Sequence, residues 1–331
     1  MRVLTVGAQG LGVYENDRPS HGDWEIARVP GFVDVHLHGG FGVDFMTSPK
    51  ADIRGWLDRL SDLGYEACLP STVSAGAEWV KSALSRLPDH PLVAGFHLEG
   101  PFISPKHPGA QPLANIVDPP TGPSEWDEIL EDPRLKLITL APERPGAIEL
   151  TRRLASRGVT VSMGHTDATY AEVAQAAEAG LNHATHTYNA MKGLHHREPG
   201  ALGYALSSDT MGCELIYDRV HVSPPAAKIL ARCAAPDRLI GISDATQGAG
   251  LPQGSSFEMW GTKCLIGAND IRLENGTLAG SKVTLLDVFQ NLWADLGPET
   301  AIRACCINPR RVIGNKPVTK WLEFDRAGRR I

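Results

Sequence analysis

The sequence predicts an α/β fold: a (β/α)8 barrel of the TIM type, with a reduced small β domain built from both termini. Eight short apolar runs alternate with longer helix-like stretches, which is typical of strands joined by crossover helices. Polar side chains suited to metal binding stand at the ends of several runs. Alternation alone also allows a doubly wound open sheet. The runs are 31–38, 67–73, 92–99, 135–143, 159–165, 181–187, 213–221 and 238–245.

Helical periodicity is clearest after the first run. Ile53, Trp56, Leu57 and Leu60 recur at the spacing of one helix face. Gly64 follows them, and glycine commonly ends a helix because it tolerates a positive φ. We therefore expect a helix here whose apolar side covers the sheet.

A second helix is predicted after the fifth run. Thr169 stands where a helix N-cap is expected, and Glu172 three residues later completes a capping box. The apolar pattern ends at Gly180. By contrast, the Pro-rich and acidic stretch 119–133 predicts a loop with a short helix.

The remaining segments define the domain boundaries. We expect residues 31–317 to form the barrel and residues 1–30 and 318–331 to form the small β domain. Segment 261–281 carries turn residues, including Asn-Gly, and predicts a hairpin. It precedes the predicted helix 282–297.

Composition excludes several classes of function. The 331 residues carry a net charge of −6 and a pI near 6.1, which argues against nucleic-acid or anionic-membrane binding. The sequence lacks an uninterrupted apolar stretch of about 20 residues. The six cysteines show no C-x-x-C spacing, and the first residues lack a signal peptide's pattern. We expect a cytoplasmic protein with reduced cysteines.

The first and third runs end in candidate metal ligands. His36 and His38 are two residues apart, so on a strand both imidazoles point to the same side. Such a pair also occurs by chance among structural histidines. Glu99 closes a strongly apolar run, so its carboxylate needs a cation or a hydrogen-bond network as compensation. Pairing with an arginine or with backbone is the alternative for Glu99.

The fifth and sixth runs also end in histidine. Together with Glu99, His165 and His186 make a set of one carboxylate and two imidazoles, which suits Zn²⁺ with one open position for water. His183 lies three residues before His186 and is interpreted as a structural residue or a neighbour of the ligands.

Asp244 closes the eighth run. There it can take a proton from a water activated by the metal and hand it to a leaving nitrogen. A cap of the following turn is the alternative. Asn189 and Arg197 follow the sixth run, and Arg219 and His221 end the seventh. The two arginines and His221 suit recognition of a phosphate. An ion pair with the adjacent Glu198 is the alternative for Arg197.

Taken together, these segments resemble the N-acetylglucosamine-6-phosphate deacetylases of the amidohydrolase superfamily. HLEGPF, GHTDATY and THTYNAM are highly specific when they occur jointly, whereas H-x-H is general to the superfamily. The matching segments follow the family order and are PGFVDVHLHGGFGVDFM, HLEGPFISPKHPGAQP, MGHTDATY, ATHTYNAMKGLHHREPG, ELIYDRVHVSP, ISDATQGAGLP and ENGTLAGS.

The resemblance implies a TIM-type barrel that hydrolyses its substrate to acetate and an amino-sugar phosphate. It implies Glu99, His165 and His186 as ligands of the main metal, and Asp244 as general base and later general acid. One or two divalent metals per subunit are expected. Zn²⁺ is favoured, and Fe²⁺, Mn²⁺ and Co²⁺ can use the same ligands.

Retention of the first-run histidines implies a place for a second metal at His36 and His38, with Glu99 bridging the two. The family is typically a homodimer in which a neighbouring subunit helps to bind the phosphate. Implied contacts with the amino-sugar phosphate fall at Ala110, Gln111, Asn189, Ala190, Arg197, His221, Leu278, Ala279 and Gly280.

Three departures from the family pattern stand out. Some members carry His at the position of Gln111. Arg219 stands where glycine is common, and we expect this cation to affect substrate affinity more than turnover. The terminal segments are also short, so the small domain should be reduced.

Other readings of the sequence lead to different functions. Cyclic-amide hydrolases and deaminases of the superfamily commonly use a carboxylated Lys, but no Lys ends the fourth run. A deacetylase of N-acetylgalactosamine-6-phosphate differs only in the epimer that it recognises. A metal-binding relative without activity is the alternative from a different class.

Overall fold

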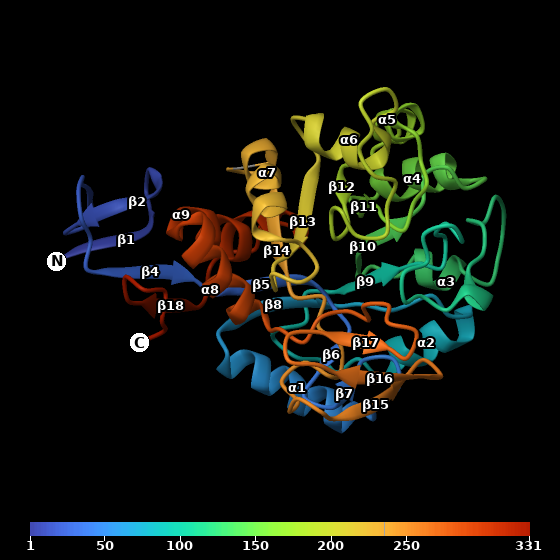
Figure 1. Cartoon of the computed structure of the whole chain (residues 1–331), viewed down its shortest axis with the longest axis horizontal. Coiled ribbons are helices and arrows are strands. Elements are labelled where there is room, and N and C mark those ends of the chain that lie inside the picture. The colour runs from blue at the N-terminus through green and yellow to red at the C-terminus, as the bar shows by residue number, and fades with distance from the viewer. Residues whose placement is uncertain (235) are drawn as a thin grey trace.

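The computed structural model describes residues 1–234 and 236–331. At its centre, six parallel strands form a curled sheet in the order β14-β13-β12-β11-β10-β9 (Figure 1). The strands are β9 (Phe96–Glu99), β10 (Leu135–Leu140), β11 (Thr160–Met163), β12 (His183–Ala184), β13 (Gly212–Ile216) and β14 (Leu239–Ile242). The sheet confirms the predicted α/β class with parallel strands.

A second parallel pair, β5 (Phe32–Leu37) and β8 (Tyr65–Pro70), meets both edges of this sheet. On one side, Ser71 forms a parallel bridge with His97 of β9. On the other, the Asp244 amide, just after β14, donates to the His36 carbonyl at 2.9 Å. The carboxyl ends of all these strands therefore point to one region of the molecule.

Helices follow most of the strands and lie around the sheet (Figure 1). The α-helices are α1 (Lys50–Asp62), α2 (Ala77–Arg86), α3 (Asp127–Leu130), α4 (Ala147–Ala155), α5 (Tyr170–Glu178), α6 (Gly200–Ser207), α7 (Pro224–Ala234), α8 (Leu285–Leu296) and α9 (Pro298–Ile302). Short turns of other helix types occupy Leu113–Asn115, Arg303–Ile307 and Asn308–Arg311. None of the helices in the described residues is long and apolar enough to cross a bilayer.

The helix signals in the sequence are confirmed. In α1 the buried face consists of Ile53, Trp56, Leu57 and Leu60, and Gly64 follows with φ 103°. In α5 the Thr169 side chain accepts from the Glu172 amide, and the Glu172 side chain accepts from the Thr169 amide. The stretch 119–133 holds the short helix α3, as predicted.

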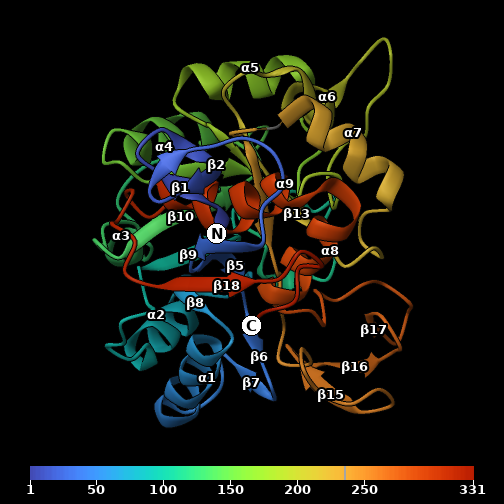
Figure 2. The same ribbon diagram turned by 90° about the vertical axis from the view of Figure 1, so that its left-hand side faces the viewer.

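The two ends of the chain pair in a five-stranded sheet of order β18-β4-β1-β2-β3. β18 runs antiparallel to β4, and Figure 2 shows both chain ends beside this sheet. The sequence predicted such a sheet from both termini. Its strands are β1 (Arg2–Gly7), β2 (Gly10–Glu15), β3 (Arg18–Pro19), β4 (Ile26–Pro30) and β18 (Trp321–Phe324).

The segment after β14 forms a small antiparallel sheet of β15 (Ser256–Met259), β16 (Thr262–Ile266) and β17 (Ile271–Leu273). The predicted hairpin at 261–281 is confirmed, but the sheet begins earlier, at Ser256. Trp260 and Gly261 form the turn between β15 and β16, and both have positive φ. A short ribbon of β6 (Gly39–Gly40) and β7 (Val43–Asp44) follows β5.

Candidate active site

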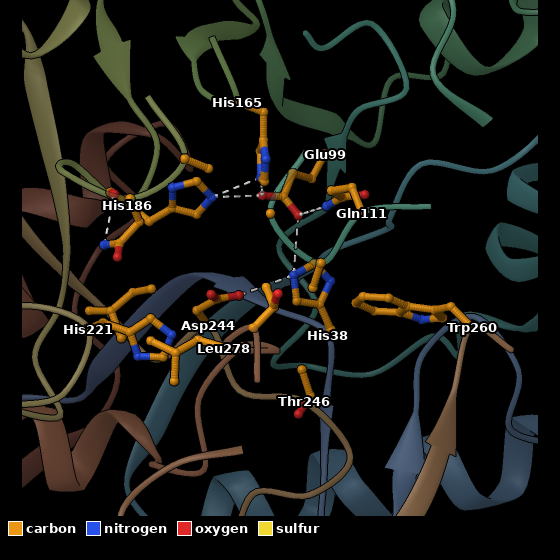
Figure 3. A pocket seen from close by; sticks show the side chains of 17 residues that line it. His38, Glu99, Gln111, His165, His186, His221, Asp244, Thr246, Trp260 and Leu278 are labelled. Carbon is orange, nitrogen blue, oxygen red and sulfur yellow. Dashed lines mark hydrogen bonds and ion pairs between the residues drawn. The ribbon is translucent and has the colours of Figure 1, made fainter. Parts of the chain in front are cut away.

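Three side chains converge at the carboxyl ends of β9, β11 and β12. Glu99 Oε1 lies 3.1 Å from Nε2 of His165 and 3.1 Å from Nε2 of His186. The two imidazole nitrogens are themselves 3.1 Å apart. Figure 3 shows both rings directed at the Glu99 carboxylate. The predicted set of one carboxylate and two histidines is thus assembled in space.

A second group of donors stands beside the first. Asp244 Oδ1 lies 3.2 Å from His38 Nε2 and 3.5 Å from His36 Nε2. Glu99 reaches this group too, because Oε1 is 3.4 Å from His36 Nε2 and Oε2 is 3.4 Å from His38 Nε2. The described residues thus form two adjoining groups of three potential metal ligands, and Glu99, a member of the first group, also contacts the two histidines of the second.

Hydrogen bonds at the far side of two of the rings suit metal binding. His38 Nδ1 donates to the Ser71 carbonyl at 3.1 Å, and His165 Nδ1 donates to the His107 carbonyl at 3.0 Å. A carbonyl can only accept, so in each neutral ring the Nε2 atom is left with a lone pair that faces a carboxylate. This arrangement of lone pairs and carboxylates fits a divalent cation.

The electrostatics of the cluster also call for positive charge. Burial by itself lowers the pKa of His38, but its bonds to Asp244 and Glu99 raise that pKa to about 9. Burial opposes ionisation of Glu99, yet the neighbouring histidines hold its pKa well below the usual range. A divalent metal bound by these groups would supply the compensating positive charge.

Backbone strain accompanies three of these residues. His165, His186 and Asp244 have φ of 47°, 29° and 47°, in the left-handed region that non-glycine residues rarely adopt. Each such residue costs on the order of 1–3 kcal/mol, and residues of this kind cluster at functional sites. The chain turns at these positions just after its strands end, which directs the side chains across the sheet's rim.

A pocket opens over both donor groups (Figure 3). His36 lies beneath it and is fully buried. Sequence reasoning missed several lining residues, namely Gly109, Ile216, Thr246, Trp260 and Thr277. The predicted site residues that line the pocket are His38, Glu99, Ala110, Gln111, His165, His186, Asn189, Ala190, His221, Asp244, Leu278 and Gly280.

Two polar side chains of the lining are held in place by neighbours. Gln111 Nε2 donates to Glu99 Oε2 at 2.7 Å, and its Oε1 accepts from the Ser74 amide at 2.7 Å. His221 Nδ1 donates to Asp218 Oδ2 at 2.7 Å. Burial lowers the pKa of His221, but this bond raises it above the ordinary value. His221 is therefore suited to meet an anionic group of a ligand.

Three predicted contact residues are absent from the lining. Arg219 Nε donates to Asp295 Oδ2 at 2.7 Å, beside a separate surface depression. Arg197 is exposed, and its guanidinium contacts the His196 ring. Ala279 is fully buried next to the lining residues Leu278 and Gly280.

Glu214 is a buried carboxylate that sequence reasoning did not single out. Its two oxygens accept from His183 Nε2 at 3.0 Å, His36 Nδ1 at 3.1 Å and the His186 amide at 3.1 Å. Glu214 thus orients the two candidate ligands His36 and His186. His183 contributes indirectly, because it is hydrogen-bonded to the same carboxylate. The available signal was a Glu inside an apolar run, the same signal that identified Glu99.

The protein class follows from the family comparison. The model of the amidohydrolase family matches residues 28–317, which include all the donor residues. This chain belongs to the amidohydrolase family.

Within that family, the similarity is to deacetylases of amino-sugar phosphates. N-acetylglucosamine-6-phosphate deacetylase of Bacillus subtilis (strain 168) is 38% identical, over 83% of this chain and 74% of the relative. N-acetylgalactosamine-6-phosphate deacetylase of Escherichia coli O157:H7 is 34% identical, over 86% of this chain and 78% of the relative.

A solved structure of a deacetylase of this kind is also similar to this chain. It is a mutant of N-acetyl-D-glucosamine-6-phosphate deacetylase from Mycobacterium smegmatis in complex with N-acetyl-D-glucosamine-6-phosphate. It superposes with a TM-score of 0.89 at 28% identity and covers 99% of this chain and 94% of that one.

Proposed function

We propose that this chain is a metal-dependent deacetylase that hydrolyses N-acetylglucosamine-6-phosphate to glucosamine-6-phosphate and acetate. The observation that carries this proposal is the pair of adjoining donor groups, one with Glu99 and the other with Asp244, under a pocket that His221 also lines. The names of the relatives, at 30–38% identity over most of the chain, support the same substrate class.

Each donor group has a distinct place in this proposal. Glu99, His165 and His186 would hold the main cation, while His36 and His38 would accommodate a second. A divalent cation there would supply Lewis-acid chemistry, which polarises an amide carbonyl and activates water for attack. Zn²⁺ suits the ligand set best, and Fe²⁺, Mn²⁺ or Co²⁺ are the alternatives.

Asp244 performs the proton transfers. It accepts a proton from the attacking water as the water oxygen bonds to the carbonyl carbon. It then delivers that proton to the sugar nitrogen as the C–N bond breaks. The products are acetate and the free amine, so the atoms balance without a further reactant.

The sugar and its phosphate occupy the part of the pocket near His221. Asn189, Ala190 and Leu278 through Gly280 supply the remaining contacts, and Ala110 and Gln111 border the acyl group. In one subunit, no Lys or Arg of the described residues lines this pocket. We therefore propose that a homodimer completes the phosphate site, with Arg197 as the candidate cation.

The architecture is proposed to be a closed (β/α)8 barrel of residues 31–317. The bridge from β8 to β9 and the hydrogen bond from Asp244 to β5 support closure around the eight strands. Residues 1–30 and 318–331 form the small β domain. A cytoplasmic location stays a prediction from the sequence.

A deacetylase specific for N-acetylgalactosamine-6-phosphate is the second candidate. The relative from Escherichia coli O157:H7 acts on that epimer according to its name, and its identity to this chain is close to that of the glucosamine enzymes. The epimers differ at one hydroxyl, so one or two contacts decide between them.

Metal-dependent acetate release is the first experiment. The protein is stripped with a chelator, reloaded with Zn²⁺, Fe²⁺, Mn²⁺ or Co²⁺, and assayed with both epimers and with unphosphorylated N-acetylglucosamine. We expect release from the glucosamine phosphate to require metal and to fall at least about 100-fold without the phosphate, because charged hydrogen bonds are lost. Absence of release from all three sugars by the metal-loaded protein would refute the proposal.

The Arg219→Gly variant tests whether that cation belongs to the site. The sequence predicted an effect on KM, but the contact with Asp295 leads us to expect KM and kcat within about twofold of the parent values. Steady-state kinetics with the phosphorylated sugar measure both constants. A KM raised about tenfold at unchanged kcat would show instead that Arg219 contributes to binding of the phosphate.

A further inference from the structure

A second cavity adjoins the candidate active site. Its volume is about 570 Å³, compared with about 240 Å³ for the pocket over the donor groups. Its walls combine the apolar side chains of Met46, Val73, Ala75 and Pro112 with polar residues, namely Asp44, Thr47, Ser74, Asn115 and Glu258. Of the described residues, Trp260 alone lines both spaces. The indole therefore forms part of the wall between the metal-binding pocket and this unassigned cavity, beside the hydrogen bond from the Ser74 amide to Gln111.

The backbone at Trp260 is unusual for a tryptophan. Trp260 and Gly261 form a two-residue turn between β15 and β16, with φ of 52° and 80°. Positive φ at both positions is the pattern of type I′ turns, in which Asn-Gly is preferred. A bulky residue at this place is strained, and such strain persists where the surroundings and the function require the side chain.

The contacts of the indole explain what holds it there. Its ring packs edge-on against the candidate ligand His38, with centroids 5.8 Å apart and planes at 76°. Its Nε1 is buried and has no hydrogen-bond partner among the described residues. The indole thus shields one side of the donor cluster from the larger cavity.

The position of Trp260 indicates which part of the substrate it faces. Figure 3 shows Trp260 and His221 on opposite sides of His38 and Asp244. The reacting carbonyl must lie at the donor groups and Asp244. With the sugar phosphate on the His221 side, the acyl methyl group points toward Trp260.

We propose that Trp260 sets the length of the acyl chain, and that the cavity behind it is a latent subsite for longer apolar acyl groups. This inference rests on the proposed deacetylase function. The ligand class is N-acyl amino-sugar phosphates with linear acyl chains of three or more carbons. The indole is the one side chain of the described residues that faces both spaces, so we expect its removal to open a passage between them.

Substrate-length profiles of the Trp260→Ala variant test the proposal. Alanine keeps a Cβ at the same positive φ, so the turn faces no backbone strain that tryptophan did not. The metal-loaded protein is assayed with N-acetyl-, N-propionyl- and N-butyrylglucosamine-6-phosphate. The parent should discriminate against each added methylene by about tenfold or more, and the variant should raise the butyryl-to-acetyl ratio of kcat/KM by at least about tenfold.

Two further variants test whether a change in the butyryl-to-acetyl ratio comes from Trp260 and the cavity behind it. Trp321→Ala removes a partly exposed tryptophan from the terminal sheet and should leave the ratio at the parent value. Adding Ala75→Phe to Trp260→Ala fills the cavity and should reverse the gain for butyryl. Circular dichroism melts and bound-metal content, measured on each protein, report folding and loading independently of turnover.

The outcomes separate this inference from the function on which it rests. A parent protein that releases no acetate refutes the deacetylase and this inference with it. A parent that releases acetate, together with a folded and metal-loaded Trp260→Ala variant whose ratio is unchanged, refutes the role of Trp260 alone. A gain that the Ala75→Phe change does not reverse overturns the cavity as the acyl subsite.

Discussion

Asp244→Asn is expected to lower kcat by about 10²–10⁴-fold while metal content and substrate affinity stay near the parent values. The amide is nearly isosteric with the carboxylate and keeps an oxygen that can accept from His38, 3.2 Å away. It cannot take up the proton of the attacking water, so the chemical step loses its base.

Three measurements on this variant separate the roles of Asp244. Metal analysis, binding of the sugar phosphate and steady-state kinetics are compared with those of the parent. Asp58→Asn serves as the matched control, because the Asp58 side chain is 65% exposed and pairs with His90, which belongs to neither donor group. Near-normal turnover would remove Asp244 from the base role. Loss of metal in proportion to activity would identify it instead as a ligand beside His36.

Glu214→Gln should weaken metal binding about 10–100-fold, the usual effect of losing a carboxylate that orients a metal-bound histidine. Glu214 is fully buried and accepts three hydrogen bonds, two of them from His36 and His183. A glutamine presents an NH2 group to one of these donors. Two N–H groups then face each other in a dry environment, which costs a buried hydrogen bond and adds repulsion.

Stability should fall together with metal affinity. Removing one partner of a buried charged pair costs about 3–5 kcal/mol, so the metal-free variant should unfold at lower urea concentration than the parent. Metal titration against a chromogenic chelator and urea unfolding provide the two readouts. Glu78→Gln, at a side chain that is 80% exposed, should change stability by less than about 0.5 kcal/mol. Parent-like metal affinity in Glu214→Gln would show that Glu214 does not position the ligands.

Local patterns in the sequence determined most of the secondary structure. The face of α1 and the capping box of Thr169 and Glu172 were predicted because they depend on residues three or four positions apart. The two terminal segments were predicted to pair because neither fits the alternation of runs and helices. The sixth run is an exception. Only His183–Ala184 is strand, because the chain turns at His186 with φ 29°.

The sequence by itself also determined which residues form the donor groups, because metal ligands differ chemically from the apolar runs that they end. Parallel strands bring those ends together, so Glu99, His165 and His186 meet although 87 positions separate the first from the last. Only the tertiary structure decided the roles of Glu214, Arg219 and Trp260. Each depends on a partner distant in sequence: His36, Asp295 and His38 respectively. Such long-range pairings follow from how the strands and loops pack, and no local periodicity records them.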